Sequence, residues 1–427
     1  MIPHLVLIYT ILVIGICDIL FRKGGIQRSL IWIIISFSFG YRTIELFSNL
    51  RFHPIELLIF ITTIKIIVFN YKKVYSFPIL LKWVGVFSII FLVIGFKENI
   101  QIKGYNEFKN FSLIFLLFYI FSFDYVTEKK IITLFTYYIF STSFIAIGGL
   151  IELFSPLFSQ AYFGISGTIN RASIGFDRIP FSFWGASTAA NLILPALPMI
   201  LYLAQSKSIF SRKPLMVWVI IIIDLYAIFL SGNRISWLIF SVLILLYLIF
   251  YNHQLTNYQK IPIFIFLIVF IGYIYSQPME GRYISTFKAM SGNIDKSFDS
   301  SGYVRYNRLI FAFDKINSNP FGSGWASAGW VHSDIIQLTA NIGIIPGFIF
   351  SIALLSLILS LYKTFSSLSA SNDKKNILFI MIMIMVYIII SFIANNNYVL
   401  PQSGVPLFFL WAFIYYYNIS VRYEIDK

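Results

Sequence analysis

The chain has a single cysteine, Cys17, among 427 residues, and only 12% of its residues carry a charge. One cysteine cannot form a disulfide within the chain or supply a thiolate cluster for a metal, so thiol redox chemistry is not expected. The sequence also lacks the glycine-lysine phosphate loop, the His-Glu-x-x-His zinc motif, the Gly-x-Ser-x-Gly nucleophile turn and any carboxylate pair with divalent-metal spacing. ATP-driven or metal-dependent chemistry therefore has no support, and no cofactor is expected.

Long apolar runs take up most of the sequence, and 58% of all residues are hydrophobic. A soluble fold would have to bury many helices of about 20 apolar residues, which ordinary globular domains do not do. We therefore expect an all-α polytopic integral membrane protein with about 12–14 transmembrane helices. The runs predict thirteen spans, near residues 5–21, 29–47, 55–70, 78–96, 111–125, 131–154, 184–204, 215–231, 235–251, 261–276, 334–362, 376–393 and 404–420.

The positive charge lies mainly in short connections between these runs. The formal net charge is +14, and basic residues gather in alternate connections, as at Lys129 and Lys130. Such connections face the cytoplasm in membrane proteins, so we place the amino terminus outside and expect no nucleic-acid partner. No internal repeat is visible, so residues 1–427 form one predicted membrane domain with longer extracytoplasmic loops at 155–183 and 277–333.

The later of these loops contains a short amphipathic segment. Apolar residues recur at helical spacing between residues 303 and 316, with Arg305 and Arg308 three positions apart on a neighbouring face. This pattern predicts a helix at the membrane interface, and Asn317–Pro320 is expected to end it. Two aromatic residues follow a glycine-rich reversal and fit the interfacial belt, namely Trp325 and Trp330.

Arginine suits a phosphate or diphosphate ligand particularly well. Its guanidinium donates two parallel hydrogen bonds to phosphate oxygens, whereas lysine offers only a point charge. A diphosphate site is therefore one interpretation of Arg305 and Arg308. Contact with lipid headgroups, or ion pairs with Asp299 and Asp314, is the other.

Arg234 lies in the segment Ser-Gly-Asn-Arg-Ile-Ser-Trp, a very short predicted outer turn between two apolar runs. Its guanidinium is thereby held near the membrane surface, where it either binds an anionic group or reaches to the headgroups as an anchor. Asp224 lies about midway along the preceding span. A carboxylate at that depth is costly unless it is paired or faces water, so Asp224 marks a bundle interior, and structural hydrogen bonding is the simpler interpretation.

His332 stands directly before Ser333 and Asp334, either of which can cap the predicted helix that starts there. Gln337 and Asn341 continue a polar face at spacings of three and four residues. Near the positive end of a helix dipole and close to arginines, protonated imidazole is disfavoured, so His332 should stay neutral and able to accept a proton. A general base needs that property, although a hydrogen-bonded interfacial histidine would look the same in sequence.

These features together resemble the O-antigen ligase/polymerase superfamily, and most closely the Wzy-type polymerases. The resemblance is carried by SGNRISW and by R-x-x-R, NPFGSG and H-S-D-x-x-Q-x-x-x-x-x-G-I-I-x-G in the late outer loop, over about residues 225–350. It implies a C-type glycosyltransferase-like helical fold in the bacterial cytoplasmic (inner) membrane, with a periplasmic active face. The Arg, ten residues, Gly pattern of some polymerases is absent here from Arg171 and Arg178.

The resemblance also implies roles for particular residues. Arg234, Arg305 and Arg308, with Arg171 and Arg178 as further candidates, would bind the diphosphate of an undecaprenyl-diphosphate-linked glycan. His332 would be the catalytic base, with Asp334 as its substitute. Expected partners are the lipid-linked donor and acceptor, membrane lipid and a chain-length regulator.

The expected reaction extends O-antigen or a related surface polysaccharide by glycosyl transfer, with lipid diphosphate as the leaving group. An O-antigen ligase, which transfers the finished chain to lipid A-core, would use the same residues. A flippase or other transporter of lipid-linked oligosaccharides is a third interpretation, but it should line a central cavity with charge and show related halves.

Overall fold

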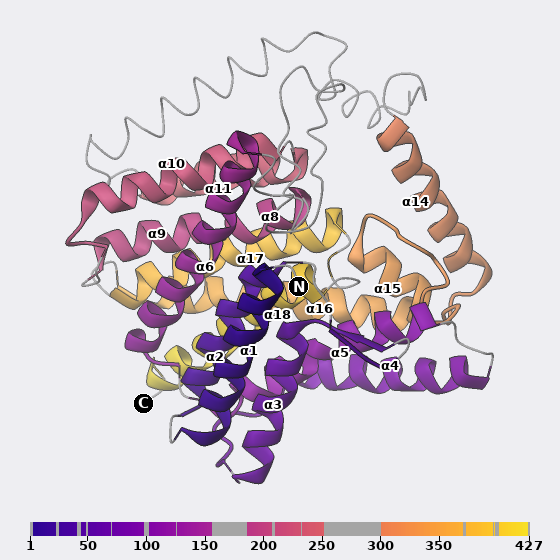
Figure 1. Ribbon diagram of the computed structural model, residues 1–427. Helices are drawn as coiled ribbons and strands as arrows, with labels where there is room; N and C mark the ends of the chain where they lie inside the picture. The colour runs from indigo at the N-terminus through magenta and orange to yellow at the C-terminus, as the bar shows by residue number, and fades with distance from the viewer. Residues whose placement is uncertain are drawn as a thin grey trace.

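The structure is a computed structural model of the chain. It describes residues 3–22, 25–40, 44–47, 50–69, 71–97, 102–124, 126–155, 186–206, 210–231, 233–251, 300–369, 373–395, 397 and 401–425. Helices make up nearly all of the regular structure in these ranges (Figure 1). They are α1 (Pro3–Phe21), α2 (Ile26–Ile35), η1 (Ser36–Phe39), α3 (Pro54–Val68), α4 (Ile79–Lys97), α5 (Ile102–Phe121), α6 (Glu128–Phe154), α8 (Ala186–Ile193), α9 (Ala196–Gln205), α10 (Pro214–Ser231), α11 (Arg234–Tyr251), α14 (Ser300–Ser318), α15 (Asp334–Ile342), α16 (Ile344–Ser367), α17 (Asp373–Ala394) and α18 (Pro401–Ile425).

Five of the described helices are long and apolar enough to cross a membrane: α6, α10, α16, α17 and α18. Shorter apolar helices pack beside them, so the chain is an α-helical protein with the composition of a membrane protein. Most predicted spans coincide with a helix, and the two that flank Arg234 coincide with α10 and α11. The span predicted at 261–276 lies outside the described residues.

Three predicted spans are wrong as continuous helices. The run 29–47 stops being helical at Phe39, and a two-stranded antiparallel hairpin of β1 (Ile44–Phe47) and β2 (Leu50–Phe52) follows. The run 184–204 is divided into α8 and α9, and Pro195 caps α9. The run 334–362 is divided into α15 and α16 at Gly343. Apolar composition alone does not reveal these interruptions, because the runs stay hydrophobic across them.

Gly343 allows the third interruption because its φ of 99° lies in the left-handed region. A Cβ at this position would stand 2.7 Å from the carbonyl carbon of Phe321. The reversal at Phe321–Gly324 is fastened to the same point, since Ile344 N–H donates to the Pro320 carbonyl at 2.9 Å. The break thus holds the late outer loop against the start of α16.

The helix α18 lies near the middle of the molecule, in contact with α5, α16 and α17 (Figure 1). Aromatic side chains fill these contacts: Trp411 of α18 is fully buried and meets Phe118 and Phe350 edge-on, with ring centroids 5.5 and 5.4 Å apart. Edge-to-face aromatic packing of this kind stabilises a core beyond simple area burial. It gives the short outer helices a firm base.

The amphipathic helix predicted at 303–316 is confirmed as α14, which stands at one side of the molecule and packs against α15 (Figure 1). Ala312 is fully buried in a small apolar cluster with Ala328, Val331 and Ala340. Other apolar side chains of α14 are exposed, among them Tyr306 and Phe313. A helix with apolar residues on its outer face suits a membrane interface.

Candidate functional site

His332 lies at the start of α15, on the loop that α14 covers. Of the two residues that could cap α15, Ser333 does so: its Oγ accepts the Ile336 N–H at 3.4 Å, and Asp334 is the first helical residue. His332 is half-buried. Within the described part of the chain, the imidazole has no hydrogen-bond partner, so its nitrogens are available to a ligand.

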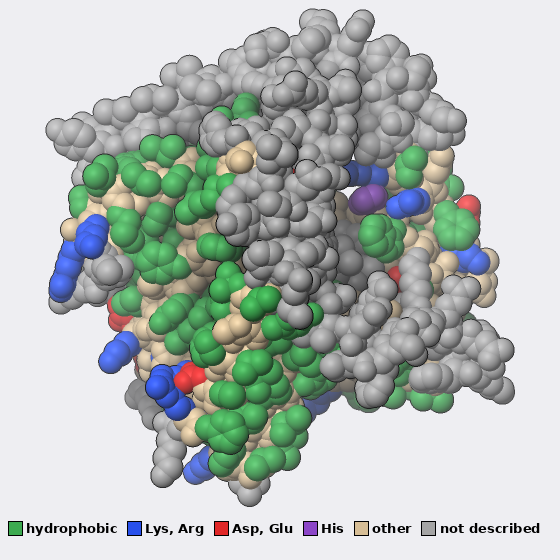
Figure 2. All heavy atoms as spheres, in the orientation of Figure 1, with side chains coloured by type: hydrophobic (Ala, Val, Ile, Leu, Met, Phe, Trp, Pro, Cys, Tyr) green, Lys and Arg blue, Asp and Glu red, His purple; other side chains and the backbone are tan. Residues whose placement is uncertain are grey.

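Arg305 and Arg308 of α14 act electrostatically on this histidine. Burial, and then the charges of Arg305 and Arg308, lower the pKa of His332 to about 4. The ring is therefore neutral at pH 7, as the sequence predicted, although burial is the first cause and was not foreseen. Figure 2 shows a histidine side chain in a recess beside α14, next to Lys and Arg side chains.

Arg308 is anchored to the same loop. Its Nη1 donates to the carbonyl oxygen of Trp330 at 3.3 Å, two residues before His332, while the side chain stays exposed. The two arginines lie one and two turns before Ala312, so the packing of α14 on α15 fixes their position. Trp330 is 45% exposed, in keeping with an interfacial place.

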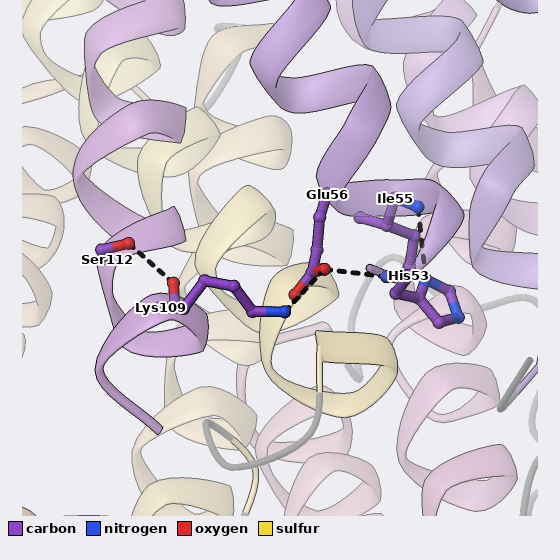
Figure 3. A network of polar contacts seen from close by, with 5 residues as sticks. All are labelled: His53, Ile55, Glu56, Lys109 and Ser112. Atoms are coloured by element: carbon purple, nitrogen blue, oxygen red, sulfur yellow. Dashed lines mark hydrogen bonds and ion pairs between the residues drawn. The ribbon is translucent and has the colours of Figure 1, made fainter. Parts of the chain in front are cut away.

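His53 shows what a purely structural histidine looks like in this chain (Figure 3). Its Nδ1 accepts the Ile55 N–H at 3.2 Å and caps α3, which leaves Nε2 to donate to the Gly40 carbonyl. Burial lowers the pKa of His53 to about 4 as well, with a smaller contribution from Lys109. Both of its nitrogens are occupied, whereas those of His332 are not.

The polar face predicted along α15 is buried between helices. Gln337 donates from Nε2 to Glu107 of α5 at 3.3 Å and accepts the Val331 N–H at Oε1 at 3.1 Å. Asn341 donates to the same Glu107 oxygen at 3.1 Å. These bonds fix the loop residue directly before His332 and the turn that follows it. The polar face therefore positions His332.

Asp334 is 1% exposed and is occupied by the loop between α17 and α18. Its Oδ1 accepts the Asn397 N–H at 2.7 Å, and its Oδ2 accepts from Asn397 Nδ2 at 2.9 Å. Asn397 Oδ1 in turn receives Asn191 Nδ2 of α8 at 3.5 Å, and Asn191 Oδ1 receives Ser236 Oγ of α11 at 3.4 Å. This polar chain joins the first turn of α15 to the first turn of α11.

Arg234 is the first residue of α11, two positions before Ser236, so its backbone lies at the far end of that chain. Asn233 caps the helix by accepting the Ile235 N–H at 3.2 Å, which confirms the short turn predicted there. The side chain of Arg234 lies outside the described part of the structure. Arg171 and Arg178 also lie outside the described residues.

Two further sequence predictions have clear outcomes. Trp325 was assigned to the interfacial belt, and this is wrong: it is 5% exposed, stacks near Phe108 and Phe111, and donates to the Ser88 carbonyl at 3.3 Å. Asp224 is fully buried in α10, as predicted, and Ser143 of α6 is its polar neighbour. Neither carboxylate oxygen of Asp224 has a hydrogen bond of normal geometry within the described structure.

Sequence reasoning missed three residues that hold the site together: Glu107, Asn191 and Asn397. Glu107 was placed in an outer loop, but α5 begins at Ile102 and carries it inside the protein. A carboxylate on the first turns of an apolar helix, with a second one in Glu56 of α3, was the available signal. Glu56 is paired with Lys109 at 3.0 Å (Figure 3). Lys109 is therefore committed to this ion pair and is not a loop charge.

The site thus contains a half-buried neutral imidazole, two exposed guanidinium groups and a rigid polar support. It can accept a proton and bind an anion at the same place. Among the described residues, no group of three or more His, Cys, Asp or Glu side chains could hold a metal ion. A scan against models of known protein families finds no match to this chain, and a search of curated proteins finds none either.

Proposed function

We propose that this protein extends a surface polysaccharide outside the cytoplasmic membrane, by transferring a growing glycan from its undecaprenyl-diphosphate carrier to a lipid-linked repeat unit. One observation carries the proposal: neutral His332 lies at the head of α15 under the charges of Arg305 and Arg308. A C-type glycosyltransferase-like arrangement and a periplasmic active face are part of the same proposal. The resemblance of the SGNRISW and H-S-D segments to Wzy-type polymerases supports it.

The reaction requires a base and an anion site close together. His332 takes the proton from an acceptor hydroxyl as that oxygen attacks the anomeric carbon of the donor. The bond from this carbon to the diphosphate oxygen breaks, and the lipid diphosphate leaves as an anion. Charge-assisted bonds from Arg305 and Arg308 stabilise this anion, each by roughly 2–4 kcal/mol by analogy with oxyanion donors.

His332 suits the role of the base better than Asp334. The carboxylate of Asp334 already accepts two hydrogen bonds from Asn397. Its buried position makes it a support for the loop that carries the base. Arg234 completes the proposed anion site from the first turn of α11, which the Asp334–Asn397–Asn191–Ser236 chain ties to α15.

Two other functions use overlapping features. An O-antigen ligase would need the same base and arginines, so only the acceptor distinguishes it from a polymerase. A flippase of lipid-linked oligosaccharides would need its cations along a central cavity. Arg305 and Arg308 are exposed on α14 at one side of the molecule, which favours an enzyme (Figure 1).

The deciding experiment removes the gene from its host and separates the surface polysaccharide by gel electrophoresis. We expect a surface that carries single repeat units, because polymerisation has stopped while flipping and ligation continue. Full-length chains retained on the lipid carrier would indicate a ligase instead. Single units stranded on the cytoplasmic side would indicate a flippase and overturn the enzymatic proposal.

Complementation with variants then tests the residues. We expect His332→Ala and the Arg305→Ala/Arg308→Ala double variant to abolish polymer at normal protein levels, and Arg234→Lys to reduce it, since lysine cannot make the bidentate contact. Arg422→Ala is the matched control, because this exposed arginine of α18 contacts only Ser360 in the described structure. Normal polymer length in the double variant would rule out the diphosphate role.

A further inference from the structure

A groove of about 690 Å³ opens between α1, α2 and α6, away from the outer site. Its walls are apolar and partly exposed, as at Val13 (57%) and Phe21 (81%). Gly15 leaves space for the indole of Trp32 in the wall, since a Cβ there would stand 2.9 Å from Trp32 Cε3. The volume is in the range of ordinary ligand pockets.

Charged groups gather at one end of this groove, where α1 ends and α2 begins. Asp18 is the centre: it accepts from Nε of Arg28 and from Nε1 of Trp32, both at 2.8 Å, and lies 3.5 Å from Nη1 of Arg22. Lys65 of α3 interacts electrostatically with both Asp18 and Arg28. Three cations therefore surround one carboxylate, which leaves a local excess of two positive charges.

The two arginines retain capacity for a ligand. Their side chains are 66% (Arg22) and 41% (Arg28) exposed. Asp18 meets Nε of Arg28 and a single Nη of Arg22, so the other guanidinium nitrogens have no acceptor in the part of the chain that the structure describes. Figure 2 shows Lys and Arg side chains beside an acidic one at the lower ends of α1 and α2, next to hydrophobic side chains.

The depth of this charged end fits a membrane surface. The 19 residues of α1 span about 28 Å, close to the thickness of the hydrocarbon core. The apolar part of the groove would then face acyl chains, and the arginines would stand at headgroup level. Charge distribution along the sequence places this end on the cytoplasmic side, where anionic lipids are attracted by basic clusters.

We propose that this groove binds one anionic phospholipid, with its phosphate on Arg22 and Arg28 and its acyl chains along Val13, Ile14 and Phe21. Asp18 orients the two guanidinium groups, and Lys65 adds to the attraction. The site is distinct from the outer one around His332 and does not depend on the proposed glycosyl transfer. A zwitterionic lipid fits less well, because its own cation opposes the local positive charge.

Cys17, the only cysteine of the chain, lies exposed in the wall of this groove and provides a probe. The experiment measures the rate at which a membrane-permeant maleimide alkylates Cys17 in the purified full-length protein in detergent, as phosphatidylglycerol or phosphatidylcholine is added. The rate should fall as 1/(1 + [L]/Kd), hence about tenfold once phosphatidylglycerol exceeds its Kd about ninefold. Phosphatidylcholine should slow alkylation far less.

Variants show whether the arginines cause this protection. Arg22→Gln should weaken it several-fold while the Arg28–Asp18–Trp32 contacts and the thermal midpoint stay unchanged, and Arg28→Gln should weaken it further. Arg422→Gln removes a charge elsewhere and should leave protection intact. Equal protection by phosphatidylcholine, equal protection by inorganic phosphate, or equal loss in Arg422→Gln would each overturn the proposal, since these outcomes mean an apolar annulus, a soluble-anion site and bulk charge.

Discussion

His332 combines two properties that a single sequence cannot easily separate, namely a low pKa and open nitrogens. Burial and the charges of Arg305 and Arg308 lower its pKa to about 4. His53 has a similarly low pKa, but both of its nitrogens serve the backbone. The pKa alone therefore does not identify a base. Geometry does, because only His332 stands beside exposed cations with its ring unbonded in the described structure.

A base with this pKa predicts an unusual pH profile. Below its folded pKa His332 is protonated and inactive, and above it the ring is neutral, so turnover of lipid-linked substrate should stay flat from about pH 5.5 to 8 and fall only near pH 4. Arg305→Gln removes one of the charges that disfavour protonation, so its acidic limb should move to higher pH. The measurement is turnover against pH in detergent, with Arg422→Gln as control. An acidic limb near the ordinary histidine pKa in the unaltered protein would contradict the role of His332.

Part of the site was predictable residue by residue, and part was not. The short turn before Arg234, the helix that carries Arg305 and Arg308, and the cap at Ser333 follow from local patterns of capping and periodicity, and the structure confirms them. Glu107 and Gln337 are 230 positions apart, and no local pattern announces such a pair. The supports of the site depend on tertiary packing, which is why sequence reasoning missed them.

Among the elements, the helix breaks were the main surprise. Hydrophobic runs define α10, α11, α17 and α18 to within a few residues, because polar residues or turns bound them on both sides. The run 334–362 has a glycine at position 343 but no polar boundary, so it was predicted as one helix. A glycine inside an apolar run marks either a tolerated residue or a break, and only the contact with Phe321 decides which.

Gly343→Ala should therefore disrupt the attachment of the late outer loop. The residue has a φ of 99°, and an added Cβ would stand 2.7 Å from the Phe321 carbonyl. Backbone strain alone costs of order 1–3 kcal/mol, and the clash adds to it, so the thermal unfolding midpoint in detergent and the polymer yield should both fall. Gly25→Ala is the matched control, since nothing lies within 4 Å of its added Cβ and its φ is −61°. Equal midpoints for the two variants would show that the break is not a rigid joint.

At the scale of the whole molecule, composition predicted a helical membrane protein, and the described helices agree with that. The buried polar chain from Ser236 to Asp334 was not predictable, although it gives the fold its specific arrangement. It links α8, α11, α15 and the loop after α17, whose apolar surfaces alone would allow many packings. Polar contacts in a low-dielectric interior have few alternative partners, so they select one arrangement among these.

Asp334 and Asn397 offer a direct test of this specificity, because they are 63 residues apart and meet through complementary groups. Asp334→Asn sets an amide donor against Asn397 Nδ2, and Asn397→Asp sets two carboxylates together, so each change should cost about 1–3 kcal/mol and lower both thermal midpoint and polymer yield. The double variant Asp334→Asn/Asn397→Asp restores a carboxylate–amide pair and leaves the 397 N–H an acceptor in the new amide oxygen. It should recover part of the lost midpoint. Recovery stays partial because Asn397 Nδ2 also donates to Ser391 O at 3.0 Å, and an aspartate cannot. Strictly additive losses would mean that the two side chains act independently, and the polar chain would then not be what holds α15 in place.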